Sequence, residues 1–242
     1  MPRAQTPNES ECHRHMQMLD NPIWHALSTT HSSFTVGNSL AKHYPRDVAP
    51  LAALPEQSAE AYKTLAAFIP LGDGAALFLK TEPTPSANWT LLHHASMYQM
   101  ICNTLPDIAE PGEHRLLTPA DVPEMLALTE LTEPGPFRER TIELGSYLGV
   151  FHSGRLVAMA GERLRLTGFT EISAVCTHPD YRGRGYARRL ILAKISHILH
   201  RGETPFLHVR ANNTPAIQLY KSIGFQTHNA LHLAVVTPRK VL

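Results

Sequence analysis

The sequence has few of the features that mark a specialised environment. Only three of its 242 residues are cysteines, Cys12, Cys102 and Cys176, and they lie far apart. An odd number of separated cysteines argues against a disulfide framework and indicates a reducing compartment. No apolar run approaches the roughly 18 residues that a membrane-spanning helix needs, and residues 3–14 are too polar for a signal-peptide core. We therefore expect a cytoplasmic protein without membrane contact.

The sequence also lacks a charge imbalance. It contains 22 basic and 21 acidic residues, which gives a formal net charge of +1, and 43% of its residues are hydrophobic. Proteins that bind nucleic acid through surface charge normally carry a clear basic excess. The composition therefore indicates an ordinary globular protein with no nucleic-acid partner. It leaves open whether the chain forms a homodimer.

Residues 106–112 combine proline, glycine and acidic residues, which predicts a linker between two units. The first unit, residues 19–110, predicts a smaller α/β domain, and residues 113–242 predict a second domain. Residues 1–18 predict a flexible tail. Cys12, His13 and His15 lie in that tail, but no further ligands follow at zinc spacing, so we expect no metal site.

Local patterns predict the elements of both units. Asp20 as an N-cap and Pro22 predict the start of a helix, whereas Thr118 with Asp121 predicts a capping box. Strands are predicted at 32–36, 75–79, 89–94, 115–117, 146–151, 155–162, 171–177, 205–210 and 231–236, and further helices at 58–69, after 118, after 186 and after 214.

The most informative stretch runs from Glu171 to Leu192. A strand-like segment ends at Pro179, and a helix follows whose apolar residues share one face, with Lys194 pointing away from it. The glycines between strand and helix let the backbone approach a ligand, and the N–H groups at a helix N-terminus favour an anion. The stretch therefore predicts a phosphate-binding loop made of Arg182, Gly183, Arg184, Gly185, Tyr186 and Ala187.

This loop has neither the dinucleotide pattern G-x-G-x-x-G nor the P-loop pattern. It resembles the R-x-x-G-x-[GA] signature of the GNAT superfamily of N-acetyltransferases. Residues 209–225 resemble a second block of that superfamily, N-x-x-A-x-x-L-Y-x-x-x-G-F. The order of predicted elements from residue 113 onwards is also similar to this family. In layout, the N-terminal half resembles that of the glycine N-acyltransferase-like branch, where it is regarded as a degenerate acetyltransferase-like lobe.

The resemblance implies an α/β (α+β) fold in which a mixed, mostly antiparallel central sheet is flanked by helices. It implies acetyl-CoA as co-substrate, with its pyrophosphate on the loop. Backbone groups of Val175, Cys176 and Thr177 would hold the pantetheine arm, and one of their N–H groups would bind the thioester oxygen. Asn213 would hydrogen-bond the pantetheine or the start of its helix.

Acetyl transfer to an amine needs a neutral nucleophile and a proton for the departing thiolate. An alkyl amine is only about one part in a thousand neutral at pH 7, so a base or a dehydrating pocket must remove its proton. Glu171 occupies the strand position where several family members place a catalytic glutamate, and we expect burial to raise its pKa. Tyr220, from the second block, would protonate the thiolate. Cys176 as a nucleophile and His178 as a base stay as alternatives.

The expected acceptor is the primary amine of a small molecule or an amino acid. Residues 131–145 and the N-terminal half would bind it, and Arg138 and Arg140 would suit a carboxylate, although surface ion pairs explain them equally well. The alternative function is a non-catalytic acyl-CoA-binding sensor or interaction module. Glu171 together with Tyr220 favours the enzyme, because a pure binding module needs neither.

Overall fold

The computed structural model describes residues 15–104 and 113–240. The predicted linker at 106–112 and the Cys12 and His13 side chains lie outside these ranges. The helices are α2 (Pro22–Ser28), α3 (Ala59–Ala66), α4 (Val122–Thr132), α5 (Tyr186–His200) and α6 (Thr214–Ile223), with short 3-10 helices η1 (Met18–Asp20), η2 (Ser32–Phe34), η3 (Pro119–Asp121), η4 (Thr141–Leu144) and η5 (Pro179–Tyr181). The strands are β1 (Val36–Gly37), β2 (Lys42–His43), β3 (Ala52–Ala53), β4 (Ala75–Leu79), β5 (Trp89–Ile101), β6 (Arg115–Leu116), β7 (Tyr147–His152), β8 (Arg155–Leu166), β9 (Phe169–Thr177), β10 (Thr204–Arg210) and β11 (Gln226–Pro238).

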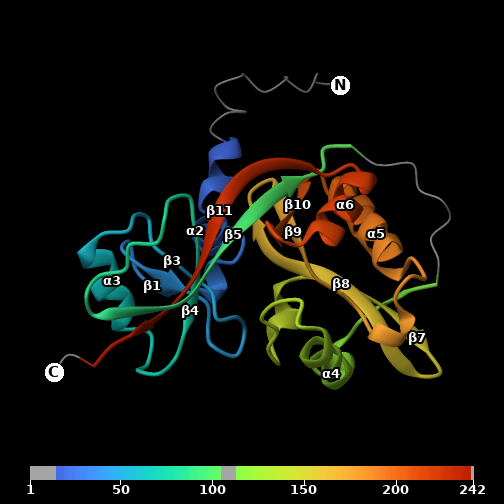
Figure 1. The fold of residues 1–242 in the computed structure, drawn as a ribbon, viewed down its shortest axis with the longest axis horizontal. Helices are drawn as coiled ribbons and strands as arrows, with labels where there is room; N and C mark the ends of the chain where they lie inside the picture. Colours follow the sequence, from blue (N-terminus) through green and yellow to red (C-terminus); the bar gives the residue numbers. More distant parts are fainter. Residues whose placement is uncertain (1–14, 105–112, 241–242) are drawn as a thin grey trace.

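One large sheet organises the described residues. It has eight strands in the order β4-β11-β5-β10-β9-β8-β7-β6, and its neighbours are antiparallel except β9 and β10, which are parallel. A parallel pair needs a crossover connection, and α5 supplies it. The long strands β5 and β11 run side by side from one half of the molecule into the other (Figure 1). The predicted mixed, mostly antiparallel sheet flanked by helices is confirmed.

Helices cover both faces of this sheet. Apolar side chains of α5 and α6 pack on one face against Ile172 and Leu207. The opposite face carries Phe169 and Phe206, which pack with α2, and farther along the same face α4 packs against Met159. The alternation of side chains along each strand separates the two layers. No helix within the described ranges is long and apolar enough to cross a bilayer.

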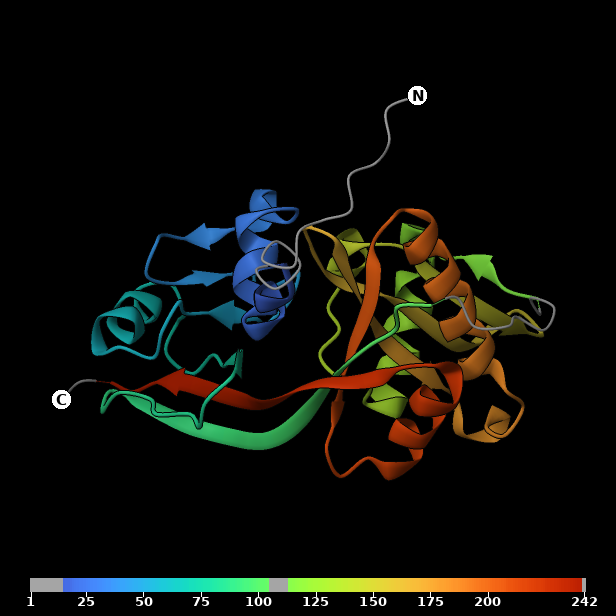
Figure 2. The same cartoon turned by 90° about the horizontal axis from the view of Figure 1, so that it is seen from above.

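The N-terminal half adds a small sheet, β1-β2-β3, and a helix, α3. Tyr62 and Leu65 of α3 share a core cluster with Trp89 of β5 and Val236 of β11. The sheet therefore continues across the predicted boundary (Figure 2). From the N-terminal half, β4 pairs with β11, and β5 pairs with both β10 and β11. The division into residues 19–110 and 113–242 stays a prediction.

The N-terminal segment departs from the local predictions at two points. The helix after Asp20 is present as α2, but its N-cap is Asn21, whose Oδ1 accepts from the Trp24 N–H at 3.4 Å. Residues Ser32–Phe34 form η2 rather than a strand, since the Phe34 N–H donates locally to the His31 carbonyl at 2.9 Å. Such local hydrogen bonds compete with strand pairing.

Lys194 also differs from its prediction, because it is fully buried. Its Nζ pairs with Glu162 at 2.5 Å and donates to the Ser146 carbonyl at 2.9 Å. Arg201 binds the same carboxylate at 3.1 Å. A buried charge needs such partners, and this cluster joins α5 to β8.

Candidate active site

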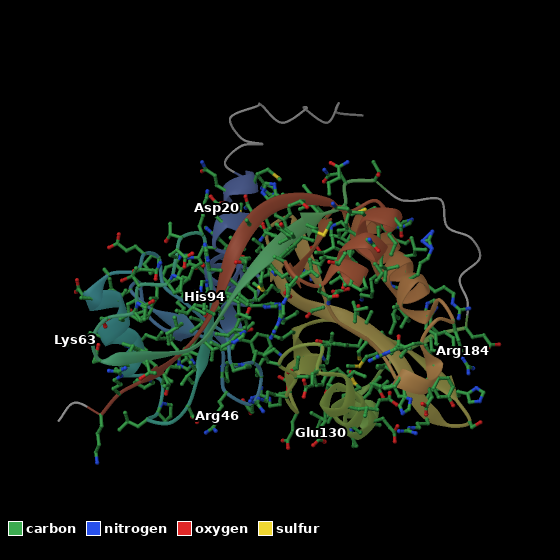
Figure 3. The ribbon with its side chains drawn as sticks, in the orientation of Figure 1. Asp20, Arg46, Lys63, His94, Glu130 and Arg184 are labelled. Atoms are coloured by element: carbon green, nitrogen blue, oxygen red, sulfur yellow. The ribbon has the colours of Figure 1, made fainter. Side chains whose placement is uncertain are left out.

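The predicted phosphate loop connects η5 to α5. Gly183 and Gly185 have φ values of 76° and 74°, in the left-handed region that favours glycine. Gly185 is the N-cap of α5, and no side chain caps this 15-residue helix. The first N–H groups of α5 are therefore available to an anion. The Arg182 and Arg184 side chains beside them are exposed, and Arg184 lies near one end of the molecule's long axis (Figure 3).

The strands β9 and β10 separate along the part of β9 that leads towards this loop. They pair only through residues Phe169–Glu171 and Thr204–Phe206, although β9 continues to Thr177 and β10 to Arg210. Ala174 has a φ of 51° at a register shift between β8 and β9, which identifies a β-bulge. Beyond it, the edge of β9 that faces β10 has no strand partner among the described residues. The backbone of 175–177 lies on this edge, where the predicted pantetheine contacts require it.

A cleft of about 430 Å³ lies beside the parted strands. Val175 of β9 and Tyr220 of α6 line it from the C-terminal half, and residues 132–136 line it from the end of α4 and the following loop. Leu51 and Phe78 line it from the N-terminal half. The N-terminal half therefore supplies one wall of the same cleft.

Glu171 lies beneath this cleft and is 1% exposed. Arg163 donates to both oxygens of its carboxylate, from Nε to Oε2 at 2.9 Å and from Nη2 to Oε1 at 2.6 Å. His208 Nδ1 lies 2.7 Å from Oε1. Both oxygens of the Glu171 carboxylate therefore accept hydrogen bonds from protein side chains.

The prediction of a raised pKa for Glu171 is wrong. Burial does favour the neutral acid, but the charge of Arg163 and the hydrogen bond from His208 outweigh it and lower the pKa to about 2. Glu171 is therefore ionised at neutral pH. A carboxylate with so low a pKa has little tendency to take a proton from an amine.

His208 is a cleft residue that the sequence analysis missed. It lines the cleft from β10, although its side chain is only 2% exposed. Because Glu171 accepts from Nδ1, the lone pair lies on Nε2, where the Gln99 amide donates at 3.1 Å. The other amide hydrogen of Gln99 is donated to the Leu19 carbonyl at 2.9 Å. Alternation along 205–210 could have placed His208 on one face of the strand, but only the register of Phe206 with Glu171 shows which carboxylate it meets.

Tyr220 faces the cleft without a hydrogen-bond partner for its hydroxyl among the described residues. Burial raises its pKa to about 12, so the phenol is protonated at neutral pH. Its ring contacts that of Phe225 with 6.0 Å between centroids, and Phe225 is a core residue at 2% exposure. A protonated, unpaired hydroxyl at the cleft can donate a proton.

The remaining predicted residues lie around this centre. Asn213 lines the cleft and is the N-cap of α6, with Oδ1 accepting from the Ala216 N–H at 3.3 Å. Cys176 is buried, which raises the pKa of its thiol to about 11 and leaves it a poor nucleophile. His178 accepts from the Asp180 N–H at 3.3 Å in the turn after β9.

The two arginines considered for a carboxylate are arranged differently. Arg140 pairs with Asp47 at 3.0 Å and with Glu143 at 2.7 Å. Arg138 is exposed and lines two further cavities next to the N-terminal half. Of these two arginines, Arg138 is the one whose guanidinium has no ion pair with a described residue.

One side-chain cluster among the described residues has metal-ligand character. His94 Nε2 lies 3.0 Å from His232 Nδ1, and Glu82 lies 3.7 Å from each ring. Neighbouring residues on a strand point to opposite faces. His93 lines the cleft, so His94 lies on the other face of β5, and the cluster is separate from the candidate active site.

Known proteins resemble this chain over its sequence and its fold. Residues 147–233 match the family model described as FR47-like protein. A crystal structure described as an acetyltransferase from the GNAT family, from Novosphingobium aromaticivorans, is 36% identical with a TM-score of 0.85 and covers 92% of this chain and 99% of that chain. The similarity therefore includes the N-terminal half.

Two curated relatives match shorter stretches. N-alpha-acetyltransferase RimI from Mycobacterium tuberculosis is 38% identical over 92 residues, which is 37% of this chain and 57% of the relative. Mycothiol acetyltransferase from Saccharomonospora viridis is 40% identical over 58 residues, which is 24% of this chain and 19% of the relative. The chain spans less than two thirds of the length of either relative.

Proposed function

The chain belongs to the GNAT family of acetyltransferases, and on that basis we propose that it transfers an acetyl group from acetyl-CoA to a primary amine. The observation that carries the proposal is the parting of β9 and β10. The edge of β9 that this parting exposes runs between the predicted phosphate loop and a cleft that has one wall from the N-terminal half. Tyr220 lies on that cleft.

Acetyl-CoA suits the residues that are present. The uncapped N-terminus of α5 with Arg182 and Arg184 offers N–H donors and charge to a pyrophosphate. The unpaired edge of β9 beyond Ala174 offers backbone groups to the amides of pantetheine. An arm that follows this edge brings the thioester to the cleft.

We assign proton removal to His208 and a positioning role to Glu171. The carboxylate of Glu171 fixes the Nδ1 tautomer and stabilises the imidazolium that forms when Nε2 takes a proton. The acceptor's ammonium replaces the Gln99 amide as the donor to Nε2, while Gln99 keeps its bond to Leu19. In this mechanism Glu171 does not deprotonate the amine directly, because both of its oxygens already accept hydrogen bonds from Arg163 and His208.

The transfer itself is a direct displacement. The neutral amine attacks the thioester carbonyl carbon, and a backbone N–H on the edge of β9 stabilises the oxyanion. The nitrogen then loses its second proton to solvent as the carbon–sulfur bond breaks, and Tyr220 gives its proton to the departing thiolate and regains one from solvent. The products are an amide and free CoA, and the acceptor's proton leaves through His208.

We propose a small-molecule amine or an amino acid as the acceptor. Leu51 and Phe78 help to line a cleft of about 430 Å³, a volume that suits a small acceptor. A protein N-terminus is the second candidate, because one relative is named an N-alpha-acetyltransferase.

The acceptor class is tested by acetyl-CoA-dependent thiol release against separate pools of amino acids, polyamines, aryl amines and short peptides. Turnover with a small-molecule pool and not with peptides supports the first candidate. Turnover with peptides alone replaces it by the second. Thermal stabilisation by acetyl-CoA with no turnover in any pool contradicts the enzyme and supports the acyl-CoA sensor.

The role of His208 is tested by His208→Gln, with His178→Gln as the matched control in the turn after β9. We expect His208→Gln to lower kcat by roughly 10²-fold while the Kd for acetyl-CoA changes little, because the side chain lies on the acceptor side of the thioester. His178→Gln should keep most of the activity. Equal activity of the two variants would remove His208 from the mechanism.

A further inference from the structure

A second, smaller cavity lies within the N-terminal half. Its volume is about 100 Å³, and its walls come from β2, from the segment 49–51 and from the segment 68–75. Phe68 and Ile69 make part of the wall apolar. Leu51 lines both this cavity and the large cleft, so the two spaces share this residue.

Two residues that line this cavity, His43 and Asp73, each carry a buried acceptor atom with no hydrogen-bond partner among the described residues. His43 Nδ1 lies 2.7 Å from the Tyr44 carbonyl and must carry the proton, so Nε2 is an acceptor, and no described residue donates to it. Burial lowers the pKa of His43, which keeps the ring neutral. Asp73 pairs through Oδ1 with Arg46 at 2.9 Å, but its buried Oδ2 has no partner among the described residues. An unsatisfied buried acceptor is destabilising, so a ligand that supplies donors gains by binding here.

The same cavity also has a cation at its border. Arg138 lines it, is exposed, and has no ion pair among the described residues. Arg46 is close enough to pair with Asp73 and is 79% exposed, which places it at the surface (Figure 3). The cavity thus combines two acceptors in its wall, an apolar surface and a free guanidinium.

We propose that this cavity binds a free α-amino acid with a small apolar side chain. The ammonium group donates to His43 Nε2 and Asp73 Oδ2, and the carboxylate pairs with Arg138. The side chain packs against Phe68 and Ile69. The volume sets the size limit, since a cavity of about 150 Å³ accommodates benzene.

The bound amino acid acts as an effector and not as the acetyl acceptor. An ammonium held against Asp73 keeps its proton and has no lone pair for attack on a thioester. Its contact with Leu51 lets it alter the wall of the large cleft. Binding at this site does not depend on the acetyl transfer proposed above.

The test is calorimetry of the full chain with individual L-amino acids, without acetyl-CoA. We expect saturable binding of one small apolar amino acid per chain, weakened at least tenfold in Asp73→Asn and in Arg138→Gln. Asp47→Asn is the matched control, because Asp47 is a nearby carboxylate paired with Arg140 that does not line this cavity. Binding of no amino acid, which would leave water as the occupant, overturns the proposal, as does equal affinity in Asp73→Asn and the control.

A second measurement separates effector from acceptor. The amino acid that binds is incubated with the protein and acetyl-CoA, and its molecular mass is then measured by mass spectrometry. We expect it to be unchanged, and acetylation that is lost in Asp73→Asn would overturn the effector role. Failure of the acetyl-transfer proposal would be seen separately, as absence of acetyl-CoA binding in the unmodified chain.

Discussion

Glu171→Gln removes one charge from the most deeply buried ion pair beside the cleft. The side chains of Arg163 and Glu171 are 12% and 1% exposed, and His208 is held by the same carboxylate. Removing one partner of a buried pair costs about 3–5 kcal/mol. Glutamine keeps one acceptor oxygen for these donors, so we expect the lower end, about 3 kcal/mol. For a chain of this length that is a fall in Tm of roughly 6–12 °C.

The pH dependence of this loss follows from the direction of the pKa shift. The pKa of Glu171 is lowered from 4.5 to about 2 in the folded protein. A lowered folded-state pKa contributes stability that is fully present above the unfolded value and is lost as the pH falls through the folded value. The difference between the unmodified chain and Glu171→Gln should therefore be constant near neutral pH and shrink between pH 4.5 and about 2.

The measurement is urea unfolding of both proteins from pH 7 downwards, with Glu143→Gln as the matched control. Arg140 also binds Glu143 through two hydrogen bonds, at 2.7 and 2.8 Å, but that pair is largely exposed and solvent screens it. We expect the control to lose far less stability. Comparable losses in the two variants, or a difference for Glu171→Gln that does not change with pH, would refute the reasoning.

Three further predictions concern other parts of the account. Tyr220→Phe should lower kcat by at least 10²-fold with little change in the Kd for acetyl-CoA, and stopped-flow turnover beside calorimetry checks this; equal losses in both would remove Tyr220 as the proton donor. Arg182→Ala and Gly185→Val should each weaken acetyl-CoA binding at least tenfold in calorimetry, the second because φ of 74° strains a β-branched residue. Arg155→Ala at the start of β8 should not weaken it, and unchanged affinity in both loop variants would contradict the phosphate loop. Lys194→Ala should destabilise the fold by about 3 kcal/mol in urea, because Glu162 loses a buried partner, and a loss below about 1 kcal/mol, typical of an exposed pair, would contradict its structural role.

The parts of the site that sequence reasoning could place are encoded locally. The predicted phosphate loop depends on two glycines, a preceding proline and a helix start, all within residues 179–187, and the structure has glycine in the left-handed region at both positions. The capping box of Thr118 and Asp121 is likewise a four-residue pattern, and both of its hydrogen bonds are present.

The parts that sequence reasoning missed depend on partners far along the chain. The pKa of Glu171 is set by Arg163 and His208, which lie 8 and 37 residues away. Strand alternation gives a face for each of these residues, but only the register of β8, β9 and β10 brings them together. Lys194 was misplaced for the same reason, since its partner Glu162 is on β8. The wall formed by Leu51 and Phe78 requires β4 to join the sheet beside β11, which no local pattern specifies.

The central claim is direct transfer of an acetyl group from acetyl-CoA to an amine in this cleft. The most direct measurement is a single-turnover experiment with acetyl-CoA labelled in the acetyl group, quenched over time and resolved into protein and small-molecule fractions. We predict that the label passes to the acceptor at the rate of CoA release and never appears on the protein. Label on the protein before it reaches the acceptor would contradict direct transfer, and label that stays on CoA with every acceptor class would contradict the enzyme itself.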